Sequence, residues 1–195
     1  MSRPPARSKL FPPAGGYRKL LSFQKSEIVF DLTFRFCRRF LKPGDRTIGQ
    51  MEQAARSGKQ NIAEGSKAAA TAKDTEIHLT NVASASLEEL LLDYEDYLRV
   101  RNLPQWEKDS PQALFMREQG KAHNADARYF LDLAESRDAE AVANMAICLI
   151  HQARFLLQRQ IQSLGERFLA EGGFRERMTR MRRTERERQQ GQSGA

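Results

Sequence analysis

Four long segments of this chain carry apolar residues at helical spacing, and none of its segments alternates in the manner of a β-strand. Apolar residues three and four positions apart share one helix face, whereas a half-buried strand has a period of two. Short links join the first three segments. The pattern therefore predicts an all-α protein, built as an up-and-down four-helix bundle with a C-terminal helical extension. The segments cover about 17–41, 46–64, 74–101 and 139–169.

The first segment is apolar over more than half of its circumference. One stripe contains Ile28, Leu32 and Phe36. A second stripe, on a different side of the helix, contains Phe23, Phe30, Phe34 and Leu41. One stripe is enough to pack a helix against a single core. The second stripe is therefore expected to meet either the C-terminal half of the chain or another copy of it.

The second segment carries a face of very small residues. Such side chains let another helix approach closely, and a glycine inside a helix costs about 1 kcal/mol relative to alanine, so it usually has a packing reason. We expect Gly65 to end this helix. Asn61 and Glu64, the polar residues of this segment's motif, are expected to lie at the edge of the helix contact. The residues of this structural motif are Ala54, Gly58, Asn61, Ile62, Glu64 and Gly65.

Prolines, glycines and charge runs suggest the boundaries of the remaining parts. Four prolines and two adjacent glycines near the N-terminus indicate a segment that buries little. Near the C-terminus, seven arginines stand against three glutamates. The expected order is a disordered basic arm (1–16), a helical bundle core (17–101), a connecting segment with short helices (102–138), a long suffix helix packing on the bundle (139–173) and an Arg-rich flexible tail (174–195).

The charge balance favours polyanions as partners. The chain has a formal net charge of +7 and a pI near 9.7, which suits nucleic acid without proving it. Aromatic residues do not interleave with these charges in an evident base-stacking pattern, so binding is expected to be sequence-tolerant and salt-sensitive. The candidate nucleic-acid-binding residues are Arg35, Arg38, Lys42, Arg56, Lys59, Arg154, Arg159, Arg180, Arg182 and Arg183.

The residues offer little for catalysis or metal binding. A di-metal bundle site needs Glu-x-x-His pairs, and this sequence has none. Asp74 and His78 are four apart, but two ligands do not make a site. There is no nucleophile signature and no glycine-rich phosphate loop. Cys37 and Cys148 lie in apolar patterns, which indicates reduced thiols and a cytoplasmic location. We expect no enzyme activity, no cofactor, no metal and no membrane span.

Several blocks of sequence resemble a known family, the four helix bundle proteins grouped with the 23S rRNA intervening-sequence proteins. The blocks are Gln53–Ser57, Asn61–Gly65 and Asn81–Leu90, and, for a longer variant with a suffix domain, Asn144–Ala153 and Phe168–Phe174. The resemblance implies a pentameric, barrel-like ring without enzymatic activity. Relatives include a basic accessory protein of diversity-generating retroelements, which binds nucleic acid and a reverse transcriptase. Short members carry an Ile-Pro pair where this chain has Gly58-Lys59.

Two hypotheses about function follow. The first is a non-enzymatic homo-oligomer that binds RNA or DNA non-specifically through basic surfaces. The second is a scaffold that recruits another protein, such as a reverse transcriptase, with no role for nucleic acid.

Overall fold

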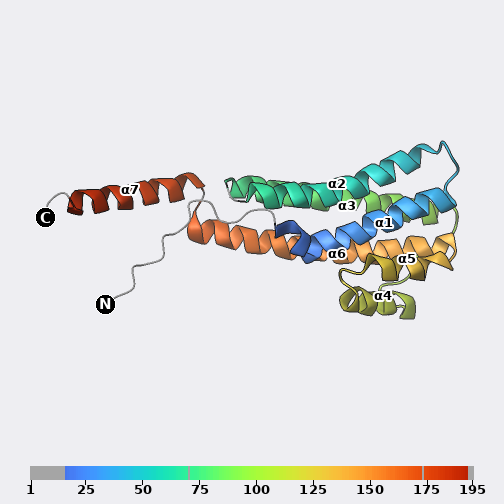
Figure 1. Ribbon diagram of the computed structural model, residues 1–195. Coiled ribbons are helices and arrows are strands. Elements are labelled where there is room, and N and C mark those ends of the chain that lie inside the picture. Colours follow the sequence, from blue (N-terminus) through green and yellow to red (C-terminus); the bar gives the residue numbers. More distant parts are fainter. Residues whose placement is uncertain (1–15, 70, 173, 193–195) are drawn as a thin grey trace.

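The structure is a computed structural model that describes residues 16–69, 71–172 and 174–192 (Figure 1). The described residues form helices and turns and contain no strand, which confirms the all-α class. None of their helices is long and apolar enough to cross a membrane. The helices are η1 (Gly16–Lys19), α1 (Leu21–Phe40), α2 (Arg46–Ala68), α3 (Lys73–Arg99), α4 (Pro111–Ala122), α5 (Ala127–Glu135), α6 (Ala139–Glu171) and α7 (Phe174–Gln192).

The four long helices α1, α2, α3 and α6 lie side by side (Figure 1). Helix α1 packs against α2 and α6, α2 packs against α3, and α3 packs against α6. The two short helices lie near one end of this assembly, where α4 packs on α6 and α5 packs on α1. Helix α7 extends away beyond the other end (Figure 1).

Aromatic side chains join α1 to α3 in the core. Phe36 contacts Tyr94 and Tyr97 with ring centroids 5.0 and 4.9 Å apart, both in the edge-on geometry that aromatic pairs prefer. Tyr94 is completely buried, and its hydroxyl donates a hydrogen bond of 3.1 Å to Thr33 Oγ1. A buried tyrosine needs such a partner for its hydroxyl, so this bond fixes how α1 and α3 face each other.

The second apolar stripe of α1 is largely covered by the same chain. Phe23 and Leu41 are buried, Phe30 is half-buried, and Phe34 keeps 42% of its surface exposed. The Lys59 ammonium of α2 lies 4.1 Å from the Phe30 ring centroid, and Phe23 contacts Tyr17 of η1 with ring centroids 4.8 Å apart. The N-terminal half of the chain thus covers part of this stripe, and of its four residues only Phe34 remains largely open.

The small-residue face of α2 packs against α3. A Cβ on Gly58 would lie 2.8 Å from Leu87 Cδ2, and one on Gly65 would lie 3.3 Å from the Glu76 carbonyl oxygen. The expectation that Gly65 ends the helix is wrong, because α2 continues to Ala68. Gly65 serves close helix contact here rather than a turn.

Polar residues of the motif lie at the edge of the α2–α3 contact. The Asn61 side-chain amide donates to the Ser57 carbonyl oxygen and to the Ser57 hydroxyl, at 3.0 and 3.1 Å. Ser86 of α3 reaches the same Ser57 hydroxyl at 3.0 Å, so this chain of bonds crosses the contact. Glu64 is exposed.

The connecting region (102–138) contains two short helices, α4 and α5, as expected. Ser110 caps α4, since its hydroxyl accepts a hydrogen bond of 3.3 Å from the Ala113 N–H. Gly172, with φ of +73°, follows the last residue of α6 and ends that helix. The Arg-rich tail forms α7 as far as Gln192, while the expected basic arm lies, apart from Gly16, outside the described residues.

Candidate nucleic-acid interface

Cations and aromatic rings gather where α1 and α2 meet at the surface. We define the α1–α2 surface as Phe30, Phe34 and Arg38 of α1 with Arg56 and Lys59 of α2. The Lys59 ammonium lies 4.1 Å from the Phe30 ring centroid, and the Arg38 guanidinium carbon lies 4.5 Å from that of Phe34. The two rings are 6.5 Å apart. The surface thus alternates π faces with positive charges.

Helical spacing accounts for this arrangement. Phe30, Phe34 and Arg38 are each four residues apart, so they lie one above another along α1. Arg56 and Lys59 are three residues apart and lie on neighbouring turns of the same side of α2. Arg56 is exposed and Lys59 is half-buried.

Two carboxylates reduce the positive charge of this surface. Glu52 lies 3.3 Å from the Arg38 guanidinium. Asp31 interacts electrostatically with Lys59. Burial raises the pKa of Asp31, the positive charge of Lys59 opposes that rise, and the negative charge of Glu27 adds to it; Arg35 opposes it as well. Arg38 is exposed, whereas Glu52 is half-buried and its Oε1 is buried without a hydrogen-bond partner. The pair therefore neutralises part of the charge that Arg38 offers to a phosphate.

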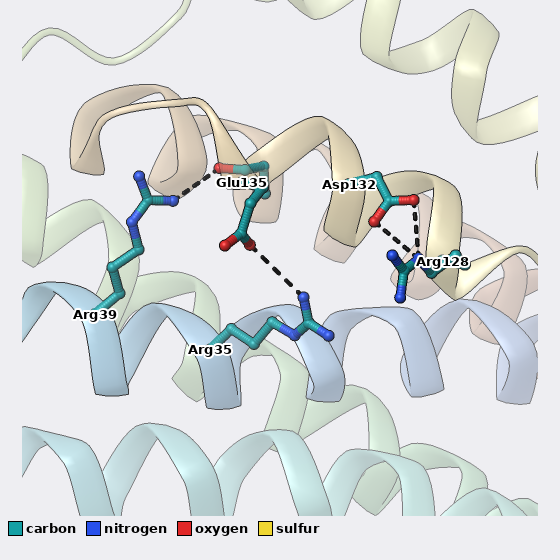
Figure 2. Close-up of polar contacts among 6 residues, drawn as sticks. Arg35, Arg39, Arg128, Asp132 and Glu135 are labelled. Carbon is teal, nitrogen blue, oxygen red and sulfur yellow. Dashed lines mark hydrogen bonds and ion pairs between the residues drawn. The ribbon is translucent and has the colours of Figure 1, made fainter.

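Arg35 belongs to a different polar cluster, between α1 and the end of α5 (Figure 2). Its Nη1 lies 3.8 Å from Glu135 Oε2. One turn further along α1, the Arg39 guanidinium donates a hydrogen bond of 3.0 Å to the Ala134 carbonyl oxygen. Both arginines point toward α5 in Figure 2, where the carbonyl end of a helix favours positive charge. These contacts dock α5 on α1.

The other predicted cations are not among the residues that define the α1–α2 surface. Lys42 is exposed just after the end of α1, and Arg159 is exposed on α6. Arg154 of α6 is half-buried and forms an ion pair with Glu88 of α3. Three more cations sit on α7, away from the long helices (Figure 1). These are Arg180, Arg182 and Arg183, all exposed. The predicted set thus divides between at least two separate regions.

The sequence showed no evident interleaving of aromatic and basic residues, but two of the basic positions do have a ring beside them in the structure. Phe30 and Phe34 lie directly beneath Lys59 and Arg38. The signal was present in the sequence, since Phe30, Phe34 and Arg38 repeat every four residues. Lys59 joins them only through the packing of α2 on α1, which the spacing within one helix does not reveal.

The thiols are protonated at neutral pH. Burial is the main cause that raises the pKa of Cys37 to about 12 and that of Cys148 to about 11. Both cysteines are free. A thiol with such a pKa is a weak nucleophile, because the thiolate is the reactive form. Across the part of the chain that the structure describes, no group of three or more His, Cys, Asp or Glu side chains could hold a metal ion.

No protein-family model matches this chain, and comparisons with the curated proteins and with the solved structures found no match. The resemblance to the four helix bundle family stays a prediction.

Proposed function

We propose that this protein is a non-enzymatic homo-oligomer that binds single-stranded nucleic acid, RNA or DNA, without sequence preference. The observation that supports this most is the α1–α2 surface, where Lys59 and Arg38 lie over the rings of Phe30 and Phe34. Cationic groups bind the phosphate backbone, and an exposed ring offers a platform to any base. Phe34, at 42% exposure, is the residue that would stack.

We also propose that α1, α2, α3 and α6 form an up-and-down four-helix bundle and that α7 is its C-terminal extension. The pairwise contacts support this, since each of the four long helices packs against two of the others. A ring of such bundles, as the family resemblance implies, would repeat the α1–α2 surface around the assembly. Repetition raises the affinity for a long polyanion well above that of one copy.

The test is a titration of labelled single-stranded DNA and RNA, and of duplex DNA, at several salt concentrations. In the test variant, Arg38, Arg56 and Lys59 are replaced by glutamine. Each lost phosphate contact reduces the salt slope for a single strand by about 0.7, so the slope should fall by about 2. In a separate variant, Phe34→Ala should weaken the binding of single strands more than that of duplex, because stacking is worth about 1–3 kcal/mol per base.

A charge-matched control separates this surface from general basicity. It carries glutamine at Arg99, Arg128 and Arg137, which are exposed and lie outside the α1–α2 surface. The control should bind with nearly the full salt slope. Equal losses in both triple variants, or no binding even at low salt, would refute the proposal. The scaffold alternative would be supported instead if this protein bound no nucleic acid but recovered one stoichiometric protein partner in a pull-down, with or without nuclease treatment. Light scattering on the same sample measures the molar mass in solution. The mass of a monomer would contradict the proposed homo-oligomer.

A further inference from the structure

A cavity of about 920 Å³ lies between α4, α6 and the segment that precedes α4. This volume is in the range of small-molecule sites, about 300–1,000 Å³. Ile147 is buried in the cavity wall, Trp106 is half-buried, and Phe155 keeps 59% of its surface exposed. Apolar and aromatic side chains gathered around a hollow, with a few polar groups among them, are typical of small-molecule sites.

A buried asparagine fixes the wall that carries Trp106. Asn144 of α6 is 1% exposed. Its amide donates a hydrogen bond of 3.0 Å to the Pro104 carbonyl oxygen, and its side-chain carbonyl oxygen accepts one of 2.8 Å from the backbone N–H of Trp106. A buried side chain bound on both sides holds its segment firmly. The backbone that carries the Trp106 indole is therefore held in place before any ligand arrives.

The opposite wall, α4, is held by two side chains from other helices. Gln152 of α6 donates a hydrogen bond of 3.2 Å to the Met116 carbonyl oxygen. Lys25 of α1, which is completely buried, donates one of 2.7 Å to the Gly120 carbonyl oxygen. A Cβ on Gly120 would collide with Gln152, so the glycine allows α4 to lie this close to α6. Both walls are preorganised.

The cavity has an excess of positive charge. Three cations line it, Lys108, Arg117 and Lys121, against one carboxylate, Glu107. Asp109 lies 3.7 Å from the Arg117 guanidinium, an exposed pair that an incoming anion can replace at small cost. Arg117 also opposes the burial-driven rise in the pKa of Cys148, which lines the cavity. The guanidinium is thus close to the cavity interior.

We propose that this cavity binds a small amphipathic anion, with an alkyl or aromatic body against Trp106, Ile147 and Phe155 and a carboxylate or phosphate head at Arg117 and Lys121. An apolar body removes the open rings from water, and a single anionic head matches the excess cations. This site is separate from the α1–α2 surface and does not depend on it.

Trp106 provides the readout, because it is the only tryptophan of the chain and it lines the cavity. The full-length protein is titrated with octanoate, octyl phosphate, octanol and octylamine while Trp106 fluorescence is recorded. We expect saturable changes with octanoate or octyl phosphate at sub-millimolar concentration, and the stronger of the two identifies the head group. Octanol and octylamine should bind at least fivefold more weakly.

Variants locate the site. The double variant Arg117→Gln and Lys121→Gln should weaken anion binding about tenfold while leaving the weak octanol response unchanged, and Phe155→Ala should weaken the binding of every probe. Arg128→Gln, an exposed arginine of α5 outside the cavity lining, is the matched control and should bind as the parent does. Three results would each overturn the proposal. They are the absence of a saturable change with either anion, binding of octylamine as strong as that of the anions, and an unaltered anion affinity in a double variant that retains its helical structure.

Discussion

Lys25 is a buried cation with one hydrogen-bond acceptor. Its ammonium reaches the Gly120 carbonyl oxygen at 2.7 Å and lies 5.4 Å from the Phe130 ring centroid. Burial lowers the pKa of Lys25 from 10.5 to about 8. The folded chain therefore releases this proton before the unfolded chain does. Between pH 8 and 10.5 the unfolded state binds more protons, and the contribution of Lys25 to stability rises with pH.

This behaviour predicts a difference between the parent protein and Lys25→Met. Below pH 8 the parent carries the full cost of the buried charge, which methionine lacks. From pH 8 to 10, which covers most of the interval between pKa values of about 8 and 10.5, the free energy of unfolding of the parent should rise relative to the variant by about 2 kcal/mol. Urea unfolding at pH 7, 8.5 and 10 measures it. Parallel curves for the two proteins would show that Lys25 has an ordinary pKa.

At the scale of the element, Gly58 shows why α2 and α3 pack so closely. A Cβ at this position would lie 2.8 Å from Leu87 Cδ2 and 2.9 Å from Leu87 Cγ, too near for either atom. Leu87 is completely buried, so it has little room to move. Alanine is the better helix former by about 1 kcal/mol, but overpacking a core typically costs about 1–3 kcal/mol. The steric cost should win.

We therefore expect Gly58→Ala to lower the free energy of unfolding by about 1 kcal/mol, the difference between these two effects. Gly49→Ala is the control from the same helix. Gly49 is exposed, and a Cβ there would meet nothing within 4 Å, so the variant should gain up to about 1 kcal/mol. Denaturant unfolding of both variants checks the pair. Stabilisation by both substitutions would mean that α2 and α3 have room to separate.

These elements also show what the sequence could and could not reveal. The helices and the close contact at Gly58 follow from spacing along one segment. The pairing of Lys59 with Phe30 depends on which helix lies beside α1, and spacing carries no such information. Arg154 is a related case: its position on α6 suggests an available cation, but the packing of α6 on α3 brings it to Glu88. The cavity beside α4 combines residues more than 40 positions apart, such as Trp106 and Phe155.

At the scale of the whole molecule, the net charge comes from residues 1–16 and 174–195, because residues 17–173 contain 22 basic and 22 acidic side chains. Two local groups of cations concern nucleic-acid binding. One is the α1–α2 surface. The other is α7, where seven arginines and three glutamates give a net charge of +4 out of +7 for the chain. Figure 1 shows α7 extending away from the long helices. Two separate basic regions on one chain can engage the same strand together, so that each raises the effective concentration of the other.

Removal of residues 174–195 tests whether α7 and the α1–α2 surface bind the same strand together. The truncated protein should keep its helical core, since α7 extends away from the long helices, and its unfolding midpoint should change little. If the arginines of α7 bind phosphates rather than bases, as the proposed function requires, the affinity for long single strands should fall uniformly across sequences, with a shallower salt slope. Short oligonucleotides that span only the α1–α2 surface should bind the two forms equally. An unchanged affinity for long strands would leave α7 without a part in binding, whereas a lowered unfolding midpoint would show that α7 supports the core instead.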